Sequence, residues 1–227
     1  MRLGQRAELV VLVPHKSLQR TKTRLRSVLS REARQALSLM MLRHVLGVCY
    51  ELQGVTQRLL CAPPELEPLA GEYGATLIAG GEAGMRRDVM AAARDPRIAG
   101  RSAMLFVSSD LPLVTVEDLE ALVEAWNRCA DLVLAPDGRE RGTNALLVNE
   151  PEVFPYAFGE AVGPGSFHTH RDQALGHDLC VEVVRRPGLQ LDLDLPEDLA
   201  ELLRQAPQDA LSGYCQARFD DRFSFEG

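Results

Sequence analysis

The segment ELVVLVPHKSLQRTKTR, residues 8–24, joins an apolar run to a basic loop and decides the fold class. Residues 8–13 are almost entirely aliphatic, and the run stops at Pro14. A short apolar run ended by proline is typical of a buried strand in a parallel sheet. The polar and basic residues that follow predict a loop at the carboxyl end of that strand.

Outward from this strand, the sequence alternates between strand and helix patterns. The expected strands are residues 8–13, 55–61, 75–78, 103–107, 132–134 and 145–148, and the expected helices are residues 30–50, 84 onward, 115–128 and 167–176. Such alternation favours a mostly parallel sheet with helices on both faces. We therefore expect an α/β fold with a single domain over residues 1–227.

Two segments do not follow this alternation. Residues 154–166 are rich in glycine, proline and aromatic side chains and predict a long loop, which in a compact domain is often functional. The tail, residues 205–227, is weakly patterned, and its packing stays open. Because ligands of such sheets bind at the carboxyl ends of the strands, the loops after the first, third and fourth strands are expected to converge.

The composition excludes several classes of protein. No apolar run approaches the roughly 18 residues that a membrane span requires, and the first residues carry no apolar leader, so a cytoplasmic location is expected. The five cysteines form no C-x-x-C pair, which argues against a zinc ribbon or a thioredoxin motif. A net charge of −7 argues against a broad nucleic-acid surface.

The positive charge that the chain does carry is concentrated in one region. Residues 14–34 contain seven cations and a single carboxylate. Only two of the 25 cationic residues of the whole chain are lysines, and both, Lys16 and Lys22, lie in this loop. A solvated helix face would explain the charge, but a compact ammonium also suits phosphate oxygens, which favours a small polyanion such as a nucleoside triphosphate.

The known phosphate-binding motifs do not account for this loop. There is no G-x-x-x-x-G-K-[ST] and no G-x-G-x-x-G after the first strand, so neither a P-loop nor a dinucleotide site is expected. Asp110, in the run Ser109-Asp110-Leu111-Pro112 after the fourth strand, is either a turn residue or a magnesium ligand. Magnesium prefers one or two carboxylates together with phosphate oxygens.

The segment LQLDLDLP, residues 189–196, alternates leucine with polar residues. In a strand, this pattern puts Asp192 and Asp194 on one face and the leucines on the other. Two carboxylates about 6–7 Å apart repel by roughly 2–3 kcal/mol at an effective dielectric near 20, so at a cleft they call for a cation. A solvated face is the alternative. With Asp110 as a third carboxylate, a two-metal site is attractive.

Two glycine-containing runs are candidate anion sites. Gly142-Thr143-Asn144 follows a strand pattern, and Gly163-Pro164-Gly165-Ser166 precedes a helix that Ser166 could cap. Turn and cap chemistry explains both equally well. The histidines at 168 and 170 are two residues apart and share no helix face, so a metal site there is disfavoured. His15 borders the basic loop, where phosphate contact stays open.

Five segments together resemble the CofC/FbiD guanylyltransferases of coenzyme F-420 biosynthesis, over roughly residues 9–203. They are VVLVPHKSLQRTKTRLRSVLS (10–30), SSDLPLV (108–114), APDGRERGTNALLV (135–148), GPGSFHTH (163–170) and LQLDLDLPEDL (189–199). The resemblance implies a Rossmann-like nucleotide-diphospho-sugar transferase fold. It also implies a reaction in which GTP and a small phosphorylated acid give a guanylyl-phospho-acid and pyrophosphate.

The resemblance also implies roles for residues. The positions that match the family's metal ligands, expected to hold two Mg²⁺ ions, are Asp110, Asp192 and Asp194. The positions that match its phospho-acid site are Thr143, Gly163 and Ser166. The nucleotide is expected at Pro14, Lys16, Lys22, Arg24 and Gly84, with Lys16, Lys22 and Asp110 serving catalysis. The expected partners are GTP, the phospho-acid, a second copy in a homodimer, and a downstream transferase that takes the product, with neither nucleic acid nor membrane.

The sequence departs from the family pattern in two places. The run Gly84-Met85-Arg86-Arg87 has arginine where the family usually has asparagine, which leaves the choice of base and acceptor open. The run from Phe158 to Ser166 is longer than the family's Phe-Gly-Pro-Gly-Ser, so either Gly159 or Gly163 matches the substrate glycine. We prefer Gly163 because it keeps its spacing to Ser166.

Phosphoenolpyruvate is the expected acceptor, with 2-phospho-L-lactate and 3-phospho-D-glycerate as alternatives. Two more distant readings are a glycosyltransferase with Asp192-x-Asp194 as its metal motif and a non-catalytic nucleotide-binding regulator. The glycosyltransferase is disfavoured because such motifs usually lie mid-domain, whereas this pair is near the end of the chain.

Overall fold

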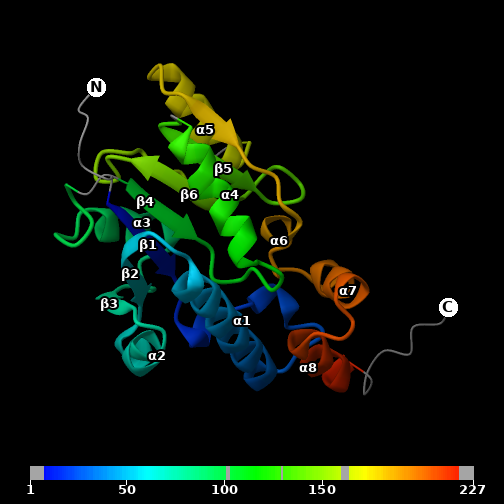
Figure 1. Ribbon diagram of the computed structural model, residues 1–227. Coiled ribbons are helices and arrows are strands. Elements are labelled where there is room, and N and C mark those ends of the chain that lie inside the picture. Colours follow the sequence, from blue (N-terminus) through cyan, green and yellow to red (C-terminus); the bar gives the residue numbers. More distant parts are fainter. Residues whose placement is uncertain (1–7, 101–102, 129, 160–163, 220–227) are drawn as a thin grey trace.

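A computed structural model describes residues 8–100, 103–128, 130–159 and 164–219 of the 227-residue chain. Its centre is a seven-stranded sheet of order β3-β2-β1-β4-β6-β5-β7 (Figure 1). The strands are β1 (Leu9–Pro14), β2 (Val55–Ala62), β3 (Thr76–Ala79), β4 (Ala103–Val107), β5 (Leu132–Pro136), β6 (Thr143–Asn149) and β7 (Val181–Val183). The six predicted strands are confirmed to within two residues at each end, and β7 was not expected.

The first strand lies at the middle of the sheet because it can be buried on both sides. β1 pairs in parallel with β2 and with β4, and all six of its residues are buried. Its side chains alternate: Val11 and Val13 face one hydrophobic core, while Val10 and Leu12 face the other. Such double-sided burial is why the sequence here is continuously apolar rather than alternating.

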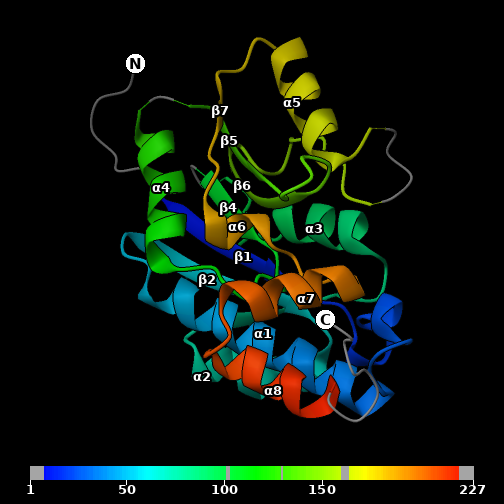
Figure 2. The same cartoon turned by 90° about the vertical axis from the view of Figure 1, so that its right-hand side faces the viewer.

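Helices cover both faces of the sheet, as predicted (Figure 2). α1 (Arg31–Glu51), α2 (Glu67–Glu72) and α4 (Val116–Asn127) pack on one face, and α3 (Met85–Ala93) and α5 (Ser166–Gly176) pack on the other. Side-chain caps begin α1 and α4. Ser30 Oγ accepts from the Ala33 amide at 3.1 Å, and Thr115 forms a capping box with Asp118. The mostly parallel mixed sheet is also confirmed, since β6 alone runs antiparallel to its neighbours β4 and β5.

Two local predictions are wrong. Residues 189–196 do not form the strand that the alternation argument assumed: α6 (Pro187–Gln190) is followed by extended chain outside the sheet. The Leu193 amide donates to the Asp110 carbonyl at 3.2 Å, so this chain is tied to the end of β4 rather than to a ladder. Burial nevertheless alternates as the pattern required, with Leu191 and Leu193 buried. Ser166 is not the cap of α5 but its first residue, because Gly165 occupies the cap position with φ of 115°.

The C-terminal segment forms a further layer beside α1. α7 (Pro196–Gln205) and α8 (Ala210–Phe219) bring Leu199, Leu211 and Cys215 against Leu37 and Met41 of α1. Figure 1 shows α8 beside α1, with α7 next to α8. The packing of the tail up to residue 219 is thereby settled, and it fixes residues 191–195 at the carboxyl edge of the sheet.

Candidate active site

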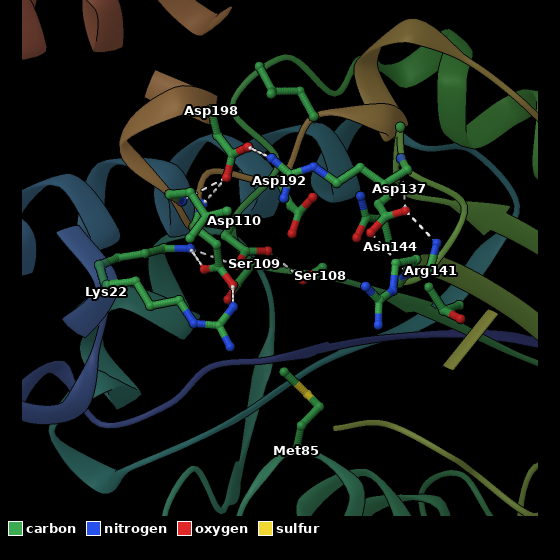
Figure 3. Close-up of a pocket in the computed structure, with 18 of the residues that line it drawn as sticks. Lys22, Met85, Ser108, Ser109, Asp110, Asp137, Arg141, Asn144, Asp192 and Asp198 are labelled. Carbon is green, nitrogen blue, oxygen red and sulfur yellow. Dashed lines mark hydrogen bonds and ion pairs between the residues drawn. The ribbon is translucent and has the colours of Figure 1, made fainter. Parts of the chain in front are cut away.

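A cleft of about 1090 Å³ opens at the carboxyl edge of the sheet. It is lined by the basic loop after β1, residues 108–110 after β4, the β5–β6 connection, the start of α5, and residues 190–198 (Figure 3). Its lining includes Lys16, Lys22, Arg24, Asp110, Thr143, Gly159, Ser166, Asp192 and Asp194. Segments as far apart in the sequence as Lys16 and Asp194 therefore converge at the edge of the sheet that the strand order predicted.

Lys22 lies at the centre of the acidic wall of this cleft. Its Nζ donates to Asp110 Oδ2 at 2.7 Å and to Asp194 Oδ1 at 2.9 Å, and its side chain is only 5% exposed. Lys22 has a φ of 47°, an unfavourable region for a residue with a side chain. Arg34 Nη1 donates to the carbonyls of Thr21 and Lys22 at 3.2 and 3.4 Å. These bonds hold the turn that aims Lys22 into the cleft.

The close pairing controls the protonation of both partners. Burial favours the neutral carboxyl of Asp110, but the Lys22 ammonium and a hydrogen bond from Ser108 Oγ at 2.6 Å outweigh it and lower its pKa to about 2. Burial likewise disfavours the Lys22 ammonium, yet the carboxylates of Asp110 and Asp194 raise the pKa of Lys22. Both groups therefore stay charged at neutral pH.

Asp192 has a different environment, although it lies two residues from Asp194. Burial raises its pKa to about 7, and the negative charges of Asp110 and Asp194 add to the shift. Within the described part of the chain, no side chain forms an ion pair with it. The same residues contain no group of three His, Cys, Asp or Glu side chains spaced to hold a metal ion, and the Lys22 ammonium donates to both Asp110 and Asp194.

Of the other residues predicted to bind the nucleotide, two line the cleft and two do not. Lys16 is exposed and lines the cleft, and Arg24 lies beside the acidic wall with Nη1 3.8 Å from Asp194 Oδ2. Pro14 is buried at the end of β1, and Gly84 precedes α3; neither lines the cleft. Met85, next to Gly84, lines it instead (Figure 3).

The predicted phospho-acid residues that the structure describes line the cleft near Asn144 and Arg141, which lie across the cleft from Lys22 (Figure 3). Thr143 is the first residue of β6, and Ser166 is the first residue of α5. Both side chains are largely buried, and both residues line the cleft. Gly165, which precedes Ser166, packs against Arg141 in the loop before Thr143. A Cβ on residue 165 would lie 2.3 Å from the Arg141 carbonyl oxygen, so only glycine allows these two loops to meet. Gly163 lies outside the described residues, whereas Gly159 lines the cleft.

Two arginines near this end of the cleft have different positions. Arg86, which departs from the family pattern, donates from Nε to the Tyr156 carbonyl at 3.0 Å and does not line the cleft. Arg141 was not predicted, yet it lies in the cleft beside Asn144 (Figure 3). The carboxylate of Asp137 accepts from the Arg141 amide at 2.8 Å and shapes the loop that carries it.

Two buried histidines lie against residues that line the cleft, and His15 also lines it. His15 is buried, and its Nδ1 lies 2.9 Å from Ser109 Oγ, which links β1 to the end of β4. Burial, reinforced by Lys22, lowers the pKa of His15 to about 4. His170 lies behind Thr143, with its Nδ1 3.0 Å from Thr143 Oγ1. The sequence analysis disfavoured a metal site at His170 and assigned this residue no other role.

Comparison with known proteins agrees with this geometry. Residues 9–217 match the family model described as Guanylyl transferase CofC like. The phosphoenolpyruvate guanylyltransferase of Rubrobacter xylanophilus is 38% identical over 84% of this chain and 91% of its own. The 3-phospho-D-glycerate guanylyltransferase of Colwellia psychrerythraea is 30% identical over 85% of this chain and 90% of its own.

Solved structures confirm the expected fold. A provisionally assigned nucleotide-diphospho-sugar transferase from Desulfovibrio desulfuricans G20 has a TM-score of 0.74 at 16% identity, covering 93% of this chain and 95% of that one. CMP:2-keto-3-deoxy-manno-octonic acid synthetase complexed with CTP has a TM-score of 0.59 at 11% identity, covering 89% and 99%. Within the described residues, no helix is long and apolar enough to span a bilayer.

The family match covers the same segments that suggested it: the basic loop, the Ser-Ser-Asp turn, the Gly-Thr-Asn run and the Asp-x-Asp segment all fall inside residues 9–217. The expectation of a nucleotidyltransferase is thereby confirmed at the level of the family. The chain belongs to the CofC-like guanylyl transferases.

Proposed function

We propose that this protein transfers the GMP unit of GTP to a small phosphorylated acid, preferably phosphoenolpyruvate, and releases pyrophosphate. The observation that carries the proposal is the arrangement of the cleft: Lys22 and Asp110 lie at one end, and Arg141 and Asn144, the neighbours of Thr143, lie at the other (Figure 3). A triphosphate fits the first end and a small phospho-acid the second. The 38% identity to a phosphoenolpyruvate guanylyltransferase supports the choice of base and acceptor.

The bond changes need no protein nucleophile. An oxygen of the acceptor phosphate attacks the α-phosphorus of GTP in line, a new P–O–P bridge forms, and the bond between the α-phosphorus and the bridging oxygen breaks, so that pyrophosphate leaves. Both reactants are anions, so the protein must position them and neutralise their charge. Lys16, Lys22 and Arg24 supply positive charge for the triphosphate, while Thr143 and Ser166 orient the acceptor.

The carboxylates fit a divalent cation in chemistry. Asp110, Asp192 and Asp194 offer the oxygen ligands that Mg²⁺ prefers, and burial together with the charges of Asp110 and Asp194 outweighs the Lys22 ammonium at Asp192. We therefore assign these three residues to two Mg²⁺ ions, which when bound neutralise the phosphates and the charge of the transition state. Because Lys22 lies between two of these carboxylates, it must release at least one of them when a metal ion binds.

The product supports a place in coenzyme F-420 biosynthesis. A guanylyl-phospho-acid contains a reactive phosphoric anhydride, so a downstream transferase that couples the acid to an alcohol with loss of GMP is the expected consumer. GTP and phosphoenolpyruvate are cytoplasmic metabolites, which makes the cytoplasm the compartment that we propose for the enzyme.

The test is pyrophosphate release from each of GTP, ATP, CTP and UTP, paired with each of phosphoenolpyruvate, 2-phospho-L-lactate and 3-phospho-D-glycerate. We expect GTP with phosphoenolpyruvate to give the highest kcat/KM. Turnover of nucleotide sugars without pyrophosphate release would instead establish a glycosyltransferase. Binding of GTP without turnover of any acid in the panel would establish a regulator.

A further inference from the structure

His170 holds a position behind the acceptor end of the cleft that the proposed reaction does not explain. It lies on α5, four residues after Ser166, and is fully buried. Its Nδ1 is 3.0 Å from Thr143 Oγ1, and its Nε2 accepts from the Ala157 amide at 2.8 Å. One imidazole thus joins three segments: the start of β6, the start of α5, and the loop after β6.

The bond to Ala157 determines which ring nitrogen carries the proton. A backbone amide can only donate, so Nε2 must be the unprotonated nitrogen. Burial lowers the pKa of His170 to about 3, so the ring is neutral and carries its one proton on Nδ1. Nδ1–H therefore donates to Thr143 Oγ1.

The direction of this hydrogen bond decides what the Thr143 hydroxyl can offer to a ligand. Its hydroxyl oxygen accepts from His170, and among the described residues no other hydrogen bond is made by that oxygen. The hydroxyl proton is then available to be donated, and Thr143 lines the cleft. A hydroxyl in this state suits an anionic oxygen, whereas a hydroxyl that donates to a histidine would present only lone pairs to the ligand.

Packing prevents the imidazole from reversing this arrangement. The rings of Phe158 and Phe154 lie 4.8 and 5.7 Å from the His170 ring, centroid to centroid. A flipped ring would face the Ala157 amide with a carbon and leave that buried donor without a partner, which costs about 1–3 kcal/mol. The aromatic side chains and the amide therefore fix both the orientation and the tautomer.

We propose that His170 is a positioning residue that turns the Thr143 hydroxyl into an obligate donor for an anionic oxygen of the phospho-acid. The proposal rests on the proposed function, because it assumes that Thr143 contacts the acceptor. His170 itself touches neither substrate. Its effect is on acceptor recognition alone, and GTP binding at the other end of the cleft does not depend on it.

Two conservative substitutions separate the two bonds of the ring. His170→Gln places an amide oxygen near the Nε2 position, where it accepts from Ala157, but leaves Thr143 without its donor. His170→Asn places an amide NH₂ near the Nδ1 position and keeps that donor. We expect His170→Gln to raise the KM for phosphoenolpyruvate roughly 2- to 13-fold, the range for one net hydrogen bond, with the KM for GTP unchanged. His170→Asn should stay closer to the wild type in acceptor KM.

A matched control lies at the other end of the same helix. His177 is exposed at the C-terminus of α5, so His177→Gln should leave both KM values unchanged. Thr143→Val tests the assumption about the acceptor. If Thr143→Val does not raise the acceptor KM, the acceptor role of Thr143 in the proposed function is wrong. The other outcome is that Thr143→Val does raise the acceptor KM. If His170→Gln then raises the acceptor KM by the same factor in the Thr143→Val background as in the wild type, the two residues are not coupled, and the inference alone is overturned.

The tautomer can be measured in the wild-type protein, independently of how the variants fold. Two-bond ¹⁵N–¹H correlation spectra of uniformly labelled protein distinguish Nδ1–H from Nε2–H for each of the five histidines. We expect His170 to be neutral and protonated on Nδ1 at pH 7. A proton on Nε2, or a doubly protonated ring, would overturn the proposal.

Discussion

Lys22 Nζ lies 2.7 Å from Asp110 Oδ2, a contact between residues 88 positions apart in the sequence. The contact joins the loop after the central strand to the end of its neighbour, and Asp194 accepts from the same ammonium at 2.9 Å. A lysine held between two carboxylates supplies the positive charge that a bound metal ion would otherwise bring. The same lysine is also the group best placed to move onto the phosphates of a nucleotide when a metal ion takes over the carboxylates.

Lys22→Met is expected to separate these two roles. Without the ammonium, turnover of GTP should fall roughly 100-fold or more, the usual cost of losing one group that stabilises transition-state charge. Binding of Mn²⁺ in the absence of nucleotide should become tighter, because Asp110 and Asp194 no longer have an internal cation. Titration followed by the EPR signal of free Mn²⁺ measures this.

The matched control for Lys22→Met is Arg26→Met, which removes an exposed cation of the same loop that does not line the cleft. It should change neither property. Mn²⁺ affinity that is unchanged or weaker in Lys22→Met would show that the lysine does not compete with the metal.

Asp192→Asn and Asp194→Asn should both abolish turnover but differ in stability. Asp192 lies among like charges, so its replacement removes repulsion and should leave the free energy of unfolding unchanged or higher. Asp194 pairs with Lys22 but is 42% exposed at its side chain, so its replacement should cost less than about 1 kcal/mol. Urea unfolding at pH 8 measures both. Turnover that survives either substitution would remove that residue from the metal site.

Arg141→Leu should weaken binding of the phospho-acid more than binding of GTP. Its guanidinium lies in the cleft, and its carbonyl accepts from the Phe167 amide at 3.1 Å, which places this residue beside Ser166. We expect the KM for phosphoenolpyruvate to rise roughly 10-fold, as for the loss of one charge-assisted hydrogen bond. Arg185→Leu, outside the cleft, is the control. An equal rise in the KM for GTP would place Arg141 at the nucleotide instead.

The buried imidazole of His170 should make folding sensitive to acid. Its pKa is about 3 in the folded protein, against 6.5 for an exposed histidine, so only the unfolded chain takes up the proton between these values. Stability from this residue is complete above pH 6.5 and is lost as the pH falls toward 3. Between pH 6.5 and 5, the wild type should lose about 2 kcal/mol more than His170→Gln. Equal losses in urea unfolding at both pH values would show that His170 is accessible to protons.

Most of the fold was predictable because each strand is a short apolar run with a clear end. β1 and β4 are buried on both faces, so their sequences carry no competing helical period. β7 escaped prediction because it is an edge strand of three half-buried residues, and α8 because its apolar residues face α1 and α7 rather than the main core.

The candidate site was predictable where charge marks it and not where tertiary contacts define it. Lys22, Asp110, Asp192 and Asp194 stand out by charge in an apolar or arginine-rich setting, and the structure brings them to one wall. The strand assumed for residues 189–196 is wrong, yet the alternation still turns both aspartates away from the leucines. The role of His170 depends on an amide donor 13 residues away, and no local pattern contains that information.

The most direct test of the proposed reaction follows the oxygen atoms. The enzyme is incubated with Mg²⁺, GTP and phosphoenolpyruvate whose phosphate oxygens are ¹⁸O, and the products are analysed by mass spectrometry. Attack by the acceptor phosphate on the α-phosphorus predicts unlabelled pyrophosphate and a guanylyl-phosphoenolpyruvate that retains every ¹⁸O atom. Label in the pyrophosphate, or no pyrophosphate at all, would contradict the proposed transfer.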